Sequence, residues 1–205
     1  MPMSPCHPAE RCAAASSIAA ALATAGVVTA LAVRKLGGRQ IGRGTGRRVF
    51  SFDNAPHVVL KLARDLLGRA QNEVEARTAG PDTASVHAHA FDYHWIISER
   101  VEPLTRAQLL GYGLTPRDLE GVAYSMLDEH GLARVETEQP PFFKAAISLL
   151  RRHPQIMPYE FGRVDSWGLR DGTPIILDHG FTYAIQWHRK AFSEGIGGDP
   201  MGCQL

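Results

Sequence analysis

The amino-acid sequence predicts an α+β protein with a strand-rich first half and a helical second half. Between residues 39 and 101, short apolar runs alternate with glycine, proline and aspartate turn residues. From residue 104 onward, residues typical of helix starts are followed by apolar residues at helical spacing. A last apolar strand over 173–177 ends in Asp178 and is bounded by glycines. The 205 residues can hold one sizeable core or a small two-lobed body, but not several independent domains.

The bulk composition excludes several classes of function. Lys plus Arg number 22 and Asp plus Glu number 21, so a broad nucleic-acid surface is not expected. Cysteines 6, 12 and 203 form no Cys-x-x-Cys pair, which argues against a disulfide framework or a zinc site and favours a reducing cytoplasm. His87 and His89 alternate on one predicted strand without a third ligand at metal-binding spacing, so we interpret them as strand or surface histidines.

The first element is an alanine-rich segment, residues 13–33, which carries no charge and precedes Arg34 and Lys35. It is long enough to span a bilayer, but most of it is Ala, Ser, Thr and Gly, which contribute little to insertion. Its larger apolar residues follow roughly one helical stripe: Ile18, Leu22, Val27, Val28, Leu31 and Val33. We predict a helix lying on the domain. A signal or membrane anchor, or a mis-assigned start, remains the alternative.

The next element is a glycine-rich hairpin over residues 39–52, with Gly42, Gly44 and Gly46 near its tip. Glycines let a backbone approach an anionic group and present N–H donors to phosphate oxygens. An ordinary flexible hairpin is the alternative. No helix follows these glycines, which argues against both the Rossmann and the Walker arrangements.

A lysine then stands in the middle of the apolar strand 57–63. Lys61 either extends from a sheet edge to solvent or faces a cleft and holds an anion, which requires a carboxylate partner. The helix predicted over 64–78 offers Glu73 and Glu75. Because these two are two residues apart, they point to different faces and only one can meet Lys61.

The chain then continues through two strands, a linker and three helices. Thr115 with Pro116 behind it is a strong helix-start signal. The predicted order is strands 85–90 and 93–101, a linker around 99–103, and helices 105–110, 115–131 and 139–153.

Three acids approach the last hairpin. Glu160 and Asp165 lie in the irregular segment 157–169, and Asp178 follows the apolar strand. A strand-end carboxylate needs a metal ion, a lysine or backbone donors to offset its desolvation. The alternative is a polar surface loop followed by a turn aspartate.

In this order the features resemble a eukaryotic-like protein kinase fold, and most closely the short kinase-like proteins encoded in bacteriophage and prophage genomes. The matching motifs are Gly42-x-Gly44-Thr45-Gly46-x-x-Val49, Val58-Val-Leu-Lys61, Gln71-Asn72-Glu73-Val-Glu75, Ser98-Glu99-Arg-Val101, Ser166-Trp167-Gly168 and Asp178-His179-Gly180. The resemblance covers residues 35–187 and implies a kinase-like N-lobe over 35–101 and a truncated helical C-lobe over 102–187. Residues 1–34 are then an N-terminal extension and residues 188–205 a flexible tail.

The resemblance also implies a ligand set for ATP and magnesium in the cytoplasm of a bacterial host. Lys61 would contact the α- and β-phosphates and pair with Glu73 or Glu75, and Asp178 would hold magnesium with Asp165 or Ser166. The remaining nucleotide contacts would come from Gly42, Gly44, Thr45, Gly46 and Val49 in the hairpin and from the backbone of Glu99 and Val101 in the linker.

The sequence departs from the kinase pattern at the catalytic loop and at the residue that follows the metal-binding acid. The His-Arg-Asp catalytic pattern is absent, so Glu160 is the candidate base, and His179 replaces the usual Phe after the metal acid. Three hypotheses follow: a minimal phosphotransferase with Lys61, Glu160 and Asp178 as catalytic residues, a pseudokinase that binds a host or phage protein partner, and an anchored structural phage protein that works through residues 13–33.

Overall fold

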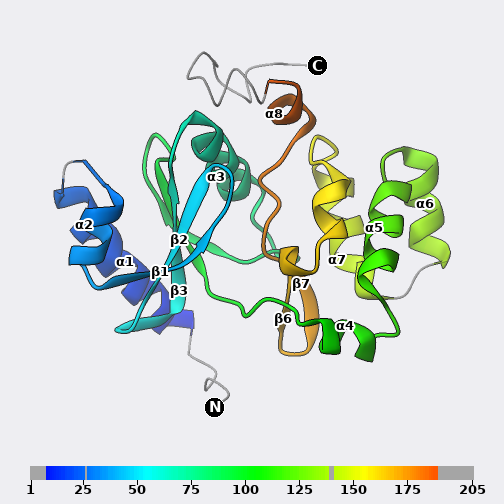
Figure 1. Cartoon of the computed structure of the whole chain (residues 1–205), viewed down its shortest axis with the longest axis horizontal. Helices are drawn as coiled ribbons and strands as arrows, with labels where there is room; N and C mark the ends of the chain where they lie inside the picture. The colour runs from blue at the N-terminus through cyan, green and yellow to red at the C-terminus, as the bar shows by residue number, and fades with distance from the viewer. Residues whose placement is uncertain (1–7, 26, 139–140, 189–205) are drawn as a thin grey trace.

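The computed structural model describes residues 8–25, 27–138 and 141–188. A five-stranded antiparallel sheet with its helices forms one end of the molecule, a group of helices forms the other, and a two-stranded hairpin lies between them (Figure 1). The α+β prediction is therefore confirmed.

The sheet has the order β1-β2-β3-β5-β4. Its strands are β1 Gly38–Arg43, β2 Arg47–Phe52, β3 Ala55–Ala63, β4 Val86–His89 and β5 Trp95–Glu99. Lys61 lies on the central strand β3, opposite Val49 on one side and Ile96 on the other. The glycine hairpin and the lysine strand are thus where the sequence predicts them, although β3 begins at Ala55, two residues before the predicted strand 57–63.

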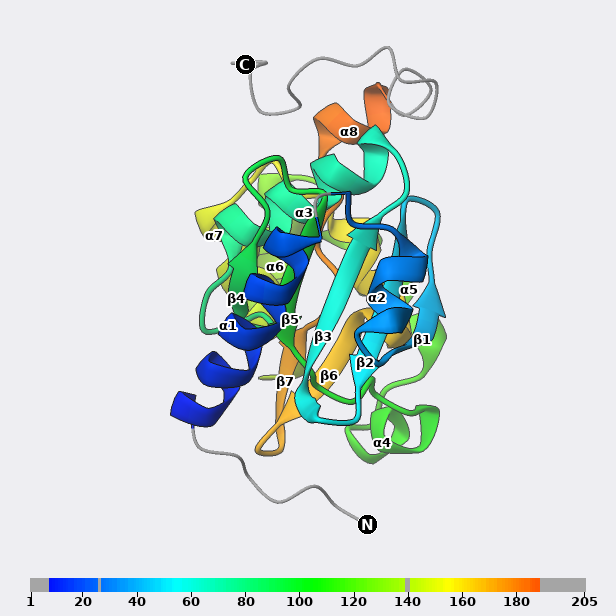
Figure 2. The same ribbon diagram turned by 90° about the vertical axis from the view of Figure 1, so that its left-hand side faces the viewer.

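Two helices, α1 Pro8–Thr24 and α2 Ala30–Lys35, cover one face of the sheet (Figure 2). The prediction of one helix over 13–33 is wrong, because a new helix begins at Ala30, where the Thr29 hydroxyl accepts a hydrogen bond from the Ala32 N–H (3.2 Å). The change of direction leaves Val27 and Leu31 exposed. The other large residues of the stripe pack against the sheet: Ile18, Leu22, Val28 and Val33. Within the described residues, no helix is long and apolar enough to cross a membrane.

The other face of the sheet holds α3, Leu66–Thr78. Asp65 begins this helix by accepting a hydrogen bond from the Gly68 N–H (2.9 Å). Leu67 and Val74 join the larger core of the helical end, so α3 connects the sheet to that end.

The helical end contains α4 Arg106–Gly111, α5 Pro116–Ser125, α6 Glu129–Glu138 and α7 Lys144–Arg152. The prediction of a single helix over 115–131 is wrong, because α5 stops at Ser125 and α6 begins at Glu129. Asp128, just before α6, accepts a hydrogen bond from the N–H of Gly131 in the first turn of that helix (2.7 Å). A Cβ at Gly131 would lie 1.7 Å from the Ser125 carbonyl oxygen, so only glycine permits this close approach.

The third predicted helix also begins late. Residues 139–140 lie outside the described part of the chain, Pro141–Phe143 form a 3-10 turn, and α7 starts at Lys144. The short helix α8, Tyr183–Trp187, follows the last hairpin. Most of the predicted tail, residues 189–205, is likewise outside the described residues.

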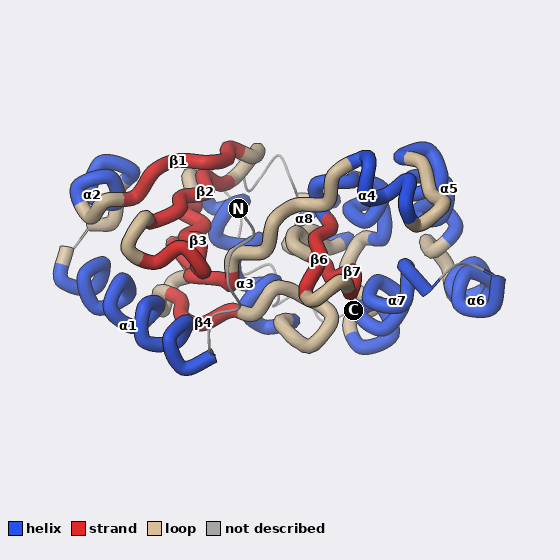
Figure 3. The backbone as a smooth tube through the Cα atoms, turned by 90° about the horizontal axis from the view of Figure 1, so that it is seen from below, coloured by secondary structure: helices blue, strands red, loops and turns tan. Residues whose placement is uncertain are grey.

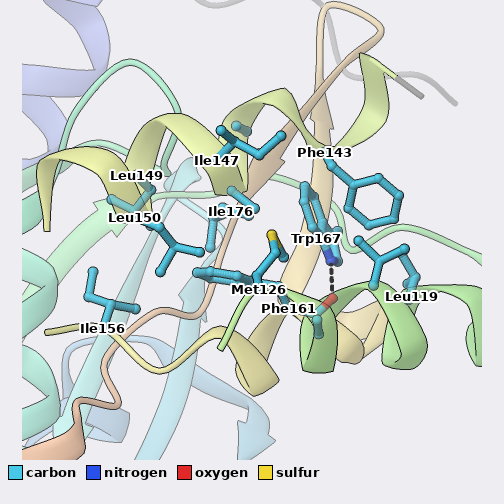
Figure 4. Close-up of a cluster of buried hydrophobic side chains, with 14 of the residues drawn as sticks. Leu119, Met126, Phe143, Ile147, Leu149, Leu150, Ile156, Phe161, Trp167 and Ile176 are labelled. Atoms are coloured by element: carbon cyan, nitrogen blue, oxygen red, sulfur yellow. Dashed lines mark hydrogen bonds between the residues drawn. The ribbon is translucent and has the colours of Figure 1, made fainter. Parts of the chain in front are cut away.

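The last hairpin consists of β6 Trp167–Arg170 and β7 Thr173–Ile176. Its anchor is Trp167, whose indole N–H donates to the Phe161 carbonyl oxygen (2.8 Å) among buried aromatic and aliphatic side chains (Figure 4). This contact fixes the 3-10 turns η2 Pro158–Gly162 and η3 Val164–Ser166, which carry the loop acids, beside the hairpin. β7 ends at Ile176, so Asp178 lies in the loop after the strand and not on it.

The hairpin is tied to the sheet end as well. The Ala84 N–H donates to the Ile176 carbonyl oxygen (2.9 Å), and the Arg170 guanidinium binds Glu99 at the end of β5 (2.5 Å). The chain passes from β5 of the sheet to α4 of the helical end through one loop, and the view from below shows the hairpin between these two ends (Figure 3). These links hold the segment after β7 opposite the centre of the sheet.

Candidate functional site

A cleft of about 440 Å³ lies between the sheet and the segment that follows β7. The sheet contributes Val49, Val59 and Lys61, and the β1–β2 loop contributes Gly44 and Thr45. The opposite wall is made by the connection 99–103, by residues of η2 and η3, and by Leu177 and Asp178. This volume suits a small organic ligand.

A group of four charged side chains closes one side of the cleft; three of them are buried, and Asp178 is partly exposed. Glu75 on α3 accepts from Lys61 on β3 (Nζ to Oε2, 2.5 Å) and from Arg47 on β2 (Nη1 to Oε1, 2.7 Å). The other terminal nitrogen of Arg47 binds Asp178 (Nη2 to Oδ1, 2.7 Å), and the Lys61 ammonium also donates to the Leu177 carbonyl oxygen (2.8 Å). Four segments distant in sequence are thereby joined by two cations and two carboxylates.

The local structure explains why these four side chains meet. Arg47 and Val49 point to the same face of β2 because side chains alternate along a strand, and Val49 is paired with Lys61 across β3. On α3, Asn72 donates to the carbonyl oxygens of Lys61 (3.3 Å) and Tyr93 (2.9 Å), which holds the helix face that bears Glu75 against the sheet.

The two carboxylates stay ionised in this setting. Burial alone would raise the pKa of Glu75, but Arg47 and Lys61 hold it below its ordinary value. The pKa of Asp178 is also lowered, since Arg47 and then Lys61 outweigh the effect of its burial. Burial would lower the pKa of the Arg47 guanidinium, and Glu75 and Asp178 raise it instead.

Glu160 behaves differently from these two acids. Its side chain is buried in η2, and burial, followed by the nearby charge of Asp178, raises its pKa to about 7. A carboxyl group that titrates near neutrality can accept or donate a proton under ordinary conditions, which is the property expected of a general base.

His179 is buried directly behind the charged group. Neither of its ring nitrogens has a hydrogen-bond partner among the described residues, and burial lowers its pKa to about 4. The imidazole is therefore neutral at physiological pH and takes the place of an apolar side chain.

The structure decides between the two candidate partners of Lys61. Glu75 is the partner, whereas Glu73 faces the other way and pairs with Arg77 one turn along α3 (2.7 Å). Glu73 and Glu75 are two residues apart and point to different faces of the helix, so only one of them can reach Lys61, and the orientation of α3 on the sheet selects Glu75.

Two of the predicted metal ligands, Asp165 and Asp178, line the same cleft, but each is engaged by an arginine. Asp165 is exposed and bound at both oxygens by Arg163 (3.0 and 2.7 Å), while Ser166 is buried and its carbonyl oxygen accepts from the Leu177 N–H (2.8 Å). One oxygen of Asp178 is occupied by Arg47. In residues 8–25, 27–138 and 141–188, no group of three or more His, Cys, Asp and Glu side chains could hold a metal ion. Magnesium is usually bound through one or two carboxylates together with phosphate oxygens, so in this structure it would have to compete with these arginines for the two acids.

Both linker residues predicted to contact a nucleotide lie beside the cleft. Val101 lines the cleft, as does Glu99. However, the Glu99 N–H donates to the Ser85 carbonyl oxygen (2.7 Å), and its carboxylate binds Arg170 (2.5 Å). The Glu99 N–H is therefore engaged inside the protein, which leaves Val101 as the linker position that can offer a backbone N–H.

The hairpin glycines have different roles. Gly44 lies open in the cleft wall, and Gly42 is next to a register shift in β1. Gly46 is instead packed on the start of α3, since a Cβ there would lie 2.8 Å from the Gly68 nitrogen and from Gln71 Oε1. Gly46 thus allows β2 and α3 to approach, and Gly44 with Thr45 is the part of the loop that can meet a ligand.

The sequence interpretation missed Arg47. A signal was present, because Arg47 shares the alternating strand face of Val49 directly after the glycines, two positions before a residue expected in the cleft. A comparison with known proteins gives no family, since no family model matches the chain and no curated protein is significantly similar to it.

Proposed function

We propose that the chain is a small kinase-like protein that binds ATP in the cleft between the sheet and the hairpin. The observation that carries this proposal is the buried ion pair of Lys61 with Glu75, next to Asp178, in a cleft of about 440 Å³. A lysine on a central strand, paired with a helix glutamate, positions an ammonium for phosphate oxygens. The order of these elements along the chain is also that of the kinase-like proteins that the sequence resembles.

The two ends of the cleft suit the two ends of a nucleotide. Val59, Ala84 and Val101 supply apolar surface for a base near the connection to the helical end. Lys61 lies in the cleft wall, where its ammonium can meet anionic groups, whereas the Gly44 N–H already donates to the Arg47 carbonyl oxygen (2.9 Å). Magnesium, which the resemblance implies, enters no step of this proposal because arginines engage Asp165 and Asp178.

Transfer of phosphate to an acceptor hydroxyl would rely on Glu160. Its pKa of about 7, caused first by burial and then by Asp178, leaves a share of the carboxylate ionised at neutral pH. The carboxylate would orient the hydroxyl and take its proton, as the aspartate of the usual catalytic loop does.

A pseudokinase is the second candidate, and one specific observation favours it. Arg47 binds one oxygen of Asp178, and Arg163 holds both oxygens of Asp165, so the acids expected to hold metal are engaged by arginines. A chain of this kind would bind nucleotide without transferring phosphate and would act through a protein partner.

Nucleotide binding is tested by the change in melting temperature that ATP with magnesium chloride produces. A ligand that binds only the folded state raises the melting temperature by mass action. We expect a rise for the wild type, a loss of that rise for Lys61→Met, and the wild-type rise for the control Lys35→Met on the exposed end of α2. No rise in the wild type would contradict the proposal.

Catalysis is tested separately by ATP turnover. The phosphotransferase predicts turnover by the wild type and a large loss in Glu160→Gln, with the ATP-induced rise in melting temperature retained. Nucleotide binding without turnover in the wild type would select the pseudokinase.

A further inference from the structure

Arg47 is the least expected member of the charged group. Its side chain is 7% exposed, and it donates to Glu75 (2.7 Å), to Asp178 (2.7 Å) and, over a longer distance, to Asn72 Oδ1 (3.4 Å). These acceptors come from α3 and from the segment after β7, so the guanidinium is held from two sides of the cleft. Such a fixed, charge-assisted arrangement favours one position for the cation.

A divalent cation at Asp178 would have to compete with this guanidinium. Binding of a metal to Asp178 Oδ1 requires displacement of Arg47 from that oxygen. Arg47 would then be a buried cation whose remaining carboxylate partner is Glu75, which already pairs with Lys61. If Arg47 stayed in place, the metal would face a positive charge at close range. Asp165 gives no help because Arg163 holds both of its oxygens.

The four groups of this cluster are balanced in charge. The two cations Arg47 and Lys61 offset the two carboxylates Glu75 and Asp178, so the negative charge of Asp178 is already compensated by a cation at 2.7 Å. Both cations also line the cleft. Arginine has five N–H donors, and the three contacts of Arg47 described above use three of them.

We infer that Arg47 supplies at Asp178 the positive charge that a metal ion would otherwise bring, so that the triphosphate of ATP is held by Arg47 and Lys61 without a divalent cation. This inference rests on the proposed nucleotide binding and makes it more specific. Arg47 is thereby a binding residue that determines whether the ligand enters with or without metal.

The test is the affinity for ATP in EDTA and in magnesium chloride, measured by isothermal titration calorimetry on the full chain. For the wild type we expect binding in EDTA with an affinity within about tenfold of that in magnesium. Arg47→Gln should lose on the order of tenfold or more in EDTA, because a charged hydrogen-bond donor to phosphate is removed. The same variant should gain dependence on magnesium, since Asp178 becomes free.

Arg48→Gln is the matched control, because Arg48 is the next residue of β2 and points to the opposite face. It should bind like the wild type in both buffers. If Arg47→Gln fails to fold, Arg47→Lys keeps a positive charge and should keep binding in EDTA, and the wild-type comparison decides the question by itself. Wild-type binding in magnesium alone would overturn the inference and leave the proposed function standing, whereas no binding in either buffer would overturn both.

Discussion

Removal of the carboxylate at Glu75 is the perturbation that the buried charges make most predictable. Glu75 is 2% exposed on its side chain and accepts from both Arg47 and Lys61. Glu75→Gln keeps the volume but leaves two buried cations with one carboxylate between them. Breaking a buried ion pair by removing one partner costs about 3–5 kcal/mol. The loss of two charge-assisted hydrogen bonds, at about 1.5–3 kcal/mol each, leads to a similar figure.

The measurement is the free energy of unfolding in urea, with Glu73→Gln as the matched control. Glu73 is two residues away on the same helix, but its partner Arg77 is 48% exposed, so its ion pair is worth about 1 kcal/mol or less. We therefore expect Glu75→Gln to lose at least about 2 kcal/mol more than Glu73→Gln. Equal losses in the two variants would refute the reasoning that Glu75 neutralises both cations.

Three further predictions concern a glycine and two titrating groups. Gly46→Ala should lose about 1–3 kcal/mol of unfolding free energy, because the added Cβ would press on the start of α3. Gly44→Ala is the control and should lose little, because a Cβ at Gly44 meets no atom within 4 Å. Equal losses in the two variants would show that the close approach at Gly46 does not matter. The pKa of His179 is lowered to about 4 in the folded state, against an ordinary value of 6.5. Between these pH values the unfolded chain binds more protons than the folded chain. The free energy of unfolding therefore falls as the pH drops from about 6.5 to 4, by about 3 kcal/mol in total. His179→Leu should flatten this part of the curve of unfolding free energy against pH, and an unchanged slope would argue against a buried neutral imidazole. If Glu160 is the base, ATP turnover should rise through pH 7 as the carboxyl group ionises, and a wild-type rate that is flat from pH 6 to 8 would remove it from that role.

Much of the fold was predictable because its signals are local. Strand alternation and turn residues predicted the glycine hairpin and the strand of Lys61, and capping residues such as Thr115 predicted where helices begin. The end of α5 was missed because the apolar periodicity continues across it, and the break depends on the close approach of Gly131 to Ser125. Such a contact depends on packing between elements and has no short-range pattern.

The contrast between local sequence signals and contacts made by packing also applies to the candidate site. The sequence predicted that Lys61 needs one carboxylate partner, and the packing of α3 selected Glu75. The role of Arg47 depends on packing between distant elements, because its partners Glu75 and Asp178 lie 28 and 131 residues further along the chain. The acid at 165 was expected beside Asp178, but its neighbour Arg163 holds it at the surface.

Direct titration of ATP into the wild type and into Lys61→Met tests the central claim most directly. The account predicts saturable binding of one ATP per chain to the wild type and an affinity at least about tenfold lower for Lys61→Met, because the variant lacks the ammonium that faces the cleft. Absence of binding to the wild type, or equal affinities for the two proteins, would contradict the claim that the ion pair of Lys61 and Glu75 forms part of a nucleotide site.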